Sequence, residues 1–185
     1  MLFSPDLLRA LSKKHPGDAD LLAEVLQRRT AWPWLCDTLG HVNNARYFDL
    51  LQEGRVAWML RNGLLRPLLR ARMSFLVAGV GGVYRQPIPL LAGFVLHTRL
   101  AAFDARWLYF EQTFALTREP TIAARFLMRV MIRAQQGPLS PHDSLRALGA
   151  ALPVRPPAPP PDLDTWASAQ EACLAEMRGG GGRTA

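Results

Sequence analysis

The sequence predicts an α+β fold in which one long buried helix is followed by four antiparallel strands. Residues 44–62 carry apolar side chains at helical spacing, whereas apolar and polar residues alternate in several segments after residue 73. Two of these alternating segments are joined by a link as short as a hairpin loop. One long helix followed by a run of strands is the α+β pattern.

The N-terminal segment, residues 1–29, is predicted to be a helical extension laid over the core. Leucines at helical spacing precede the Pro-Gly pair at 16–17, and a second helix is expected to begin at Asp18 or Asp20. Because lysine and arginine accompany these leucines, contact of residues 1–14 with a membrane surface is the alternative.

The long helix is expected to begin at the Asn43-Asn44 pair and to end before Gly63. Apolar residues lie on most of its faces, which is typical of a buried helix. Gly54 lies in its middle, where glycine costs roughly 1 kcal/mol relative to alanine. We therefore expect a neighbouring backbone to approach closely at Gly54.

Four segments are predicted to be strands: residues 73–85, 93–103, 107–117 and 122–135. The link 104–106 predicts a hairpin between the second and third strands. The last segment also fits a helix, but Phe126, Val130 and Ile132 favour a strand.

The C-terminal segment, residues 151–185, is predicted to be a tail outside the main domain of residues 30–150. Six of the nine residues in 153–161 are prolines, which predicts an extended spacer. Residues 162–177, with Trp166, are expected to form one short helix.

Composition narrows the class of protein. The formal net charge is +7, which favours an anionic partner, but no nucleic-acid-binding motif accompanies it. The two cysteines, Cys36 and Cys173, are too far apart to indicate a disulfide framework or a zinc site. No signal peptide or membrane-spanning run is recognisable, so we expect a cytoplasmic protein.

An acid, a turn glycine, a histidine and two asparagines directly precede the long helix: Asp37, Gly40, His41, Asn43 and Asn44. A helix N-terminus exposes unpaired N–H groups and suits an anion or a developing oxyanion. A thioester carbonyl held there is open to attack by Asp37, or by water that Asp37 deprotonates. The alternative is purely local, because Asp and Asn are common in turns and at helix starts.

The stretch DTLGHVNNARY, residues 37–47, resembles the signature of the 4-hydroxybenzoyl-CoA thioesterase-like branch of the hotdog superfamily. Residues 84–87, 97–99 and 103–111 resemble the group similar to thioesterase superfamily member 6. Together these similarities cover residues 30–150.

The resemblance implies an antiparallel sheet wrapped around the helix, and a homodimer or homotetramer with active sites at the subunit interface. It also implies hydrolysis of an acyl-CoA or acyl-carrier thioester, a role in lipid metabolism, and no metal or redox cofactor. The implied catalytic residues are Asp37, His41, Asn43 and Asn44, and the implied substrate-binding residues are Gly40, Tyr47, Glu53 and Arg55. Leu39 departs from the plant acyl-carrier-protein thioesterases, which have an Asn there.

Several alternatives stay open on the sequence. The chain is either an enzyme or a non-catalytic hotdog protein that binds acyl-CoA or a protein partner. The usual motifs of hotdog dehydratases are absent from the sequence, so a dehydratase is not favoured. His41 either orients the loop or acts as a base, and Glu53 either binds substrate or pairs with an arginine. Cys36 is interpreted as packing. Four arginines after the helix contact either CoA phosphates or solvent: Arg61, Arg66, Arg70 and Arg72.

Overall fold

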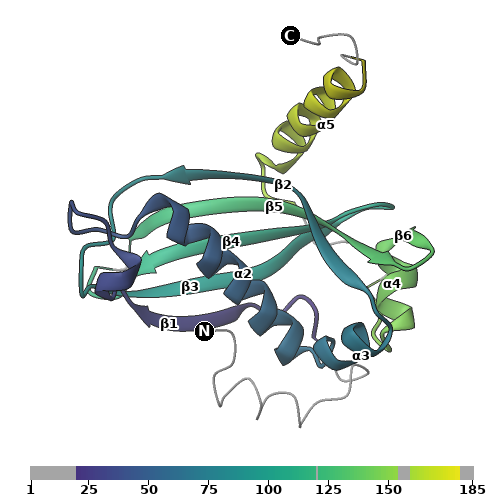
Figure 1. The fold of residues 1–185 in the computed structure, drawn as a ribbon, viewed down its shortest axis with the longest axis horizontal. Helices are drawn as coiled ribbons and strands as arrows, with labels where there is room; N and C mark the ends of the chain where they lie inside the picture. The colour runs from purple at the N-terminus through teal and green to yellow at the C-terminus, as the bar shows by residue number, and fades with distance from the viewer. Residues whose placement is uncertain (1–19, 120, 154–158, 180–185) are drawn as a thin grey trace.

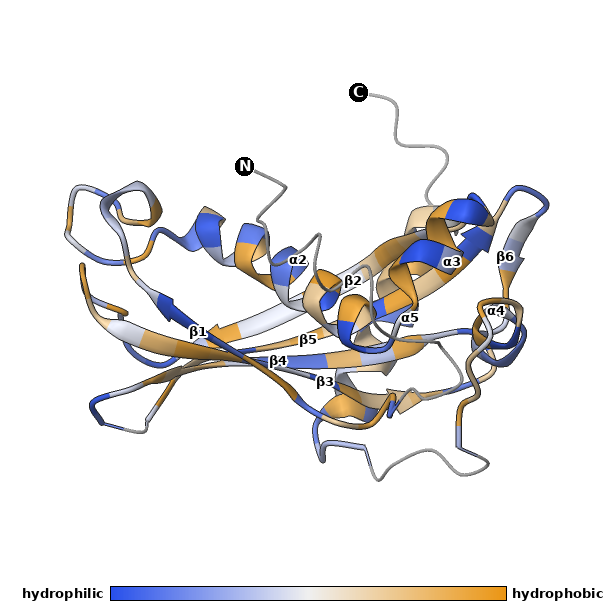
Figure 2. Cartoon of the chain, turned by 90° about the horizontal axis from the view of Figure 1, so that it is seen from below, coloured by the Kyte–Doolittle hydropathy of each residue, from blue (hydrophilic) through white to orange (hydrophobic). Residues whose placement is uncertain are grey.

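The computed structural model describes residues 20–119, 121–153 and 159–179. A curved antiparallel sheet wraps one face of the long helix α2 (Figures 1 and 2). The strand order is β1-β3-β4-β5-β2, with β6 beside β5. The strands are β1 (Val25–Thr30), β2 (Ser74–Tyr84), β3 (Gly93–Phe103), β4 (Leu108–Leu116), β5 (Ile122–Ala134) and β6 (Gly137–Leu139). The helices are η2 (Pro33–Leu35), α2 (Asn44–Arg61), α3 (Leu65–Arg70), α4 (Pro141–Ala147) and α5 (Leu163–Gly179).

The ends of α2 confirm the prediction from the sequence. The Asn43 side chain caps the helix by accepting a hydrogen bond from the N–H of Ala45 at 2.9 Å. Gly63 follows the helix with φ +67°, a left-handed conformation that glycine adopts readily. Within the described residues, no helix is long and apolar enough to cross a membrane.

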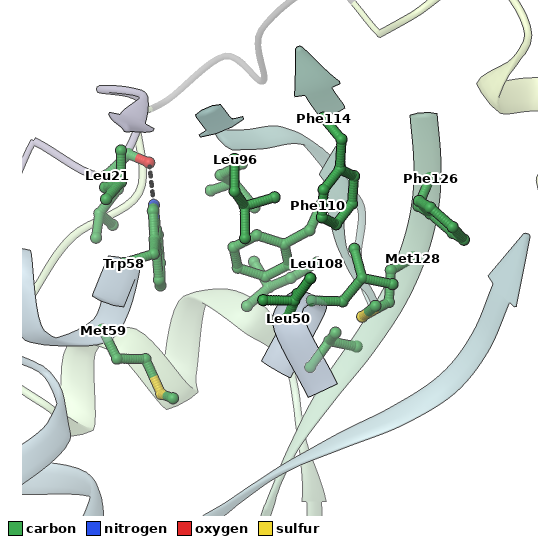
Figure 3. Packing of buried hydrophobic residues seen from close by; sticks show 14 of the residues in the cluster. Leu21, Leu50, Trp58, Met59, Leu96, Leu108, Phe110, Phe114, Phe126 and Met128 are labelled. Atoms are coloured by element: carbon green, nitrogen blue, oxygen red, sulfur yellow. Dashed lines mark hydrogen bonds between the residues drawn. The ribbon is translucent and has the colours of Figure 1, made fainter. Parts of the chain in front are cut away.

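The core lies between α2 and the concave face of the sheet. Alternate residues of β4 and β5 point towards α2 and are almost fully buried (Figure 3): Leu108, Phe110, Phe114, Phe126, Met128 and Val130. Trp58 of α2 is buried against Phe110, and its indole N–H donates to the carbonyl of Leu21 at 3.2 Å. The alternation predicted for these strands therefore positions the helix.

Gly54 lies where α2 comes closest to the sheet. A Cβ atom there would be 2.5 Å from the Thr98 hydroxyl and closer still to the amide nitrogen of Gln112. That amide donates to the carbonyl of Leu51 and to Thr98, each at 3.0 Å. The expected close approach is confirmed, but the neighbours are polar side chains rather than a backbone.

Two expectations for the helices are wrong. Residues 25–30 form β1, not part of a second N-terminal helix, because the Asp20 side chain closes only a turn and the chain then pairs with the free edge of β3. The sheet therefore begins before residue 30, and residues 1–19 lie outside the described part. Secondly, α2 is not buried on all its apolar faces within the described residues, because Phe48 is 51% exposed.

The helix of the C-terminal tail, α5, packs against the outer face of the sheet. Leu163 is buried with Trp107, Tyr109 and Leu127, and Trp166 packs against the same cluster. In Figure 1, α5 extends past β2 on the side away from β1. Most of the proline-rich spacer, residues 154–158, lies outside the described part, and the boundaries 1–29, 30–150 and 151–185 stay predictions.

Charged residues of β5 attach α5 to the sheet. Arg129 is 1% exposed; its guanidinium lies over the Trp107 ring and donates to Glu171 at 2.6 Å. Arg125 donates to both carboxylate oxygens of Asp162, at 2.5 and 2.9 Å. Arg125 and Arg129, four residues apart on β5, thus lie on the face that α5 covers.

Candidate functional site

The loop that precedes α2 is a tight turn. The N–H of Asp37 donates to the carbonyl of His41 at 3.0 Å, and the N–H of Gly40 donates to the carbonyl of Asp37 at 3.1 Å. Gly40 has φ +76°, a conformation that side chains other than glycine adopt only with strain. Gly40 therefore shapes the turn that brings Asp37 back beside His41.

The Asp37 carboxylate is held at the surface of this turn. One oxygen accepts the N–H of Leu39 at 2.9 Å, and the other lies 3.5 Å from Nδ1 of His41. The Asp37 side chain is 24% exposed, so it is only partly buried. This arrangement suits a carboxylate that acts as a base or nucleophile, with His41 orienting it.

The start of α2, which directly follows this turn in the chain, offers a backbone donor. The Asn43 side chain is occupied in capping Ala45, which gives it a structural role. Within the described residues, the backbone N–H of Asn44 has no acceptor, and Asn44 is exposed. Such a free N–H at a helix N-terminus suits a developing negative charge on oxygen.

Two neighbouring segments fix the loop in place. The N–H of Val42 donates to the carbonyl of Ile88 at 2.9 Å, and Leu90 donates to Gly40 at 2.8 Å. On the other side, Asn43 donates to Leu35 at 2.8 Å. Three leucines around this end are exposed, at 79%, 43% and 59% respectively: Leu39, Leu90 and Leu91.

Tyr47, an expected substrate-binding residue, belongs to the core. It is 2% exposed, and its ring contacts those of Tyr84 and Phe114 with centroids 5.0 and 4.8 Å apart. Burial, together with Tyr84, raises the pKa of Tyr47 to about 12. The hydroxyphenyl ring therefore packs α2 onto the sheet.

Glu53 and Arg55 are not gathered around Asp37. Nine residues of helix separate Asn44 from Glu53, a rise of about 14 Å. Glu53 accepts from Arg29 at 2.7 Å, the paired role that was the alternative. Arg55 contacts Met128, and burial lowers its pKa to about 10, so it stays charged at neutral pH. No acidic partner for Arg55 occurs within the described ranges.

The remaining candidates lie away from the turn or pack beside it. Cys36 is half-buried, and burial followed by the Asp37 charge raises the pKa of its thiol, which fits a packing role. The four arginines Arg61, Arg66, Arg70 and Arg72 are exposed, at the end of α2 and in and after α3. Because α2 is 18 residues long, roughly 27 Å separates that end from the Asp37 turn.

Sequence reasoning missed a cleft between β1, η2 and α2. Its volume is about 510 Å³, and we call it the Trp32–Trp34 cleft; the lining residues are Arg28, Arg29, Thr30, Trp32, Trp34, Leu35, Leu50 and Glu53. The signal in the sequence was RRTAWPW, two arginines followed by two tryptophans. It stayed hidden because residues 25–30 were assigned to a helix.

The sequence is similar to that of a known protein family and of named relatives. Residues 31–167 match the thioesterase-like superfamily. The chain is 31% identical over 114 residues to the protein THEM6 of Xenopus laevis, which covers 62% of this chain and 55% of the frog protein. The chain thus spans about half the length of that relative.

Solved structures share the fold. SAV2348 of Staphylococcus aureus, determined in complex with CoA, has a TM-score of 0.63 and 16% identity, covering 80% of this chain and 96% of that one. Slr0204, a 1,4-dihydroxy-2-naphthoyl-CoA thioesterase from Synechocystis, has a TM-score of 0.60 and 9% identity, with coverages of 68% and 95%. At these identities the likeness concerns the fold alone.

The sheet wrapped around α2 therefore defines a hotdog fold, as the sequence predicted. The match over residues 31–167 shows further that the chain belongs to the thioesterase-like superfamily. The predicted similarity to the member-6 group is confirmed by its relatives named THEM6.

Proposed function

We propose that this protein hydrolyses acyl-CoA thioesters, with Asp37 as the catalytic carboxylate. One observation carries the proposal: the partly exposed Asp37 carboxylate lies in the same turn that leads into the N–H of Asn44, which has no acceptor within the described residues. The superfamily supports thioester hydrolysis in general, and the CoA complex of SAV2348 supports CoA as the thiol.

In the proposed reaction, the thioester carbonyl oxygen accepts a hydrogen bond from Asn44, and the partial positive charge of the helix start stabilises the oxyanion. Asp37 takes a proton from water, which attacks the carbonyl carbon. The C–S bond then breaks, Asp37 returns the proton to the leaving sulfur, and the CoA thiol and the carboxylic acid leave; the acid ionises in solvent. In the second route Asp37 attacks the carbonyl carbon directly and the C–S bond breaks to release CoA thiolate; water then hydrolyses the resulting anhydride, which restores Asp37, and the thiolate is protonated. His41, whose Nδ1 lies 3.5 Å from the Asp37 carboxylate, orients it.

We also propose a homodimer in which the active sites lie at the subunit interface. Within the described residues the outer edge of β2 pairs with no other strand, and Phe48 and the three leucines around the Asp37 turn are exposed. A second subunit covers these apolar residues and supplies a partner for Arg55. A cytoplasmic location and a role in lipid metabolism stay predictions.

The test is hydrolysis of a panel of acyl-CoA thioesters by wild type and by Asp37→Asn. We expect kcat to fall at least about 100-fold with KM little changed, because the base or nucleophile is lost while the carbonyl donor stays. Asp49→Asn is the matched control, since Asp49 is exposed on α2 and pairs only with Arg46. Equal activity of Asp37→Asn and wild type would refute the assignment of Asp37.

The second candidate is a non-catalytic protein that binds acyl-CoA. It is favoured by the separation of Glu53 and Arg55 from Asp37, which leaves a single carboxylate in the turn. Tight retention of acyl-CoA by the wild-type protein, without turnover of any member of the panel, would select it over the enzyme.

A further inference from the structure

The Trp32–Trp34 cleft lies beside the Asp37 turn but contains none of its residues. Its apolar floor is formed by Leu35 and Leu50, and its wall by β1. A volume of about 510 Å³ falls in the range of small-molecule sites. The cleft is therefore large enough to hold a part of a ligand that does not contact Asp37.

The two tryptophans form a flat aromatic surface. Their rings stack with centroids 5.6 Å apart and an interplanar angle of 17°. Trp34 is 67% exposed and Trp32 46% exposed, although large aromatic residues are usually buried. Such a surface suits a planar ring, because stacking on an aromatic side chain is favourable for any nucleobase.

The charge of the cleft favours an anion. Arg29 is engaged by Glu53 at 2.7 Å, so these two charges offset each other. Arg28 is exposed and takes part in no ion pair within the described residues. Its guanidinium is therefore available at the cleft for a phosphate, which it can bind through two parallel hydrogen bonds.

The cleft is within reach of the proposed reaction centre. Trp34 and Asp37 are three residues apart, which limits the separation of their Cα atoms to about 11 Å. Leu35, which lines the cleft, accepts the N–H of Asn43 directly before α2. A ligand that fills the cleft can thus extend a flexible arm to the Asp37 turn.

We propose that the Trp32–Trp34 cleft binds the nucleotide end of CoA, with the adenine on Trp34 and a phosphate on Arg28. This inference rests on the proposed thioesterase function and specifies its substrate. A carrier-protein thioester has the pantetheine arm but no adenine, and cannot use this surface. The cleft therefore selects the free CoA thioester over the carrier-bound one.

The test compares one acyl group on CoA and on pantetheine, which lacks the nucleotide. For wild type we expect a lower KM with acyl-CoA. Trp34→Ala and Arg28→Ala each raise that KM roughly tenfold, leave kcat unchanged, and leave the KM for acyl-pantetheine unchanged. Trp34→Phe restores part of the loss because it keeps an aromatic face. Arg146→Ala, which removes an exposed charge on α4, is the control.

Equal effects of Trp34→Ala on both substrates, or no effect on either, would overturn the cleft assignment while leaving the proposed function intact. Absence of hydrolysis of both substrates by wild type is instead a failure of the proposed function. In that case calorimetric titration with CoA decides: weaker binding by Trp34→Ala than by wild type supports the cleft, and equal binding rejects it.

Discussion

Replacing Gly54 by alanine should destabilise the protein although it improves the helix. On propensity alone, alanine in the middle of α2 is favoured by about 1 kcal/mol. The structure reverses this sign. The added methyl carbon would lie 2.5 Å from the Thr98 hydroxyl and closer to Gln112, below the 3.0 Å that real Cβ contacts keep.

The cost follows from what must move. Thr98 and Gln112 are both fully buried, and Gln112 bridges α2 and β3 through its bonds to Leu51 and Thr98. Displacing its amide leaves a buried carbonyl without a donor, at about 1–3 kcal/mol, and overpacking adds a similar amount. After the gain in helix propensity, we expect a net loss of about 2–4 kcal/mol.

Urea unfolding followed by circular dichroism measures this loss as a shift of the midpoint at constant m-value. The double variant Gly54→Ala, Gln112→Ala is the control, because it removes the amide that obstructs the methyl group. We expect Gly54→Ala to cost less in that background than in wild type. A Gly54→Ala protein as stable as wild type would refute the reasoning.

Three further outcomes follow from contacts of the sheet. Glu171→Gln weakens the ion pair with buried Arg129 and should lower the free energy of unfolding in urea by about 1–3 kcal/mol. Glu176→Gln, on the exposed end of α5, should change it little. Arg125 lowers the pKa of Asp162. The contribution of this ion pair to stability is therefore present above the ordinary carboxyl pKa of 3.8 and is lost as pH falls through the lowered pKa. Asp162→Asn should flatten the acid limb of a curve of stability against pH. Burial raises the pKa of Tyr47 from 10.0 to about 12. The stability that the neutral Tyr47 side chain gives the folded protein is therefore complete below pH 10 and is lost as pH rises towards 12. If Tyr47→Phe left the fall of stability above pH 10 unchanged, this reasoning would be contradicted.

Elements with long regular patterns were predictable from the sequence. α2 and the strands β3 to β5 lie where the periodicity indicated, because each has buried residues at the spacing of its element. β2 also lies where it was predicted, although none of its residues is fully buried. β1 was missed because it is short, and its leucine-rich approach has helical spacing. Its conformation is decided by pairing with β3, a partner about 70 residues away that local spacing does not reveal.

In the candidate site, too, local features were predictable from the sequence and contacts between distant segments were not. The turn around Asp37 and Gly40 depends on hydrogen bonds between residues close in sequence, and its shape was foreseeable. The environments of Glu53 and Arg55 depend on Arg29 and Met128, which come from β1 and β5. Glu53 and Arg55 were predicted from the sequence to bind substrate, but in the folded chain each contacts a residue of a distant strand instead.

The outer face of β2 lacks side chains where α5 crosses it. Gly79 and Gly81 leave the space that Gln170 and Trp166 fill, so a segment 85 residues from Gly81 completes the surface of the strand. Such a distant contact carries an entropic penalty, which the prolines of 153–161 reduce because they restrict the unfolded chain. The glycines of β2 and the prolines of the connector therefore depend on each other. A chain without α5 would leave the outer face of β2 uncovered at Gly79 and Gly81, and such a surface favours self-association.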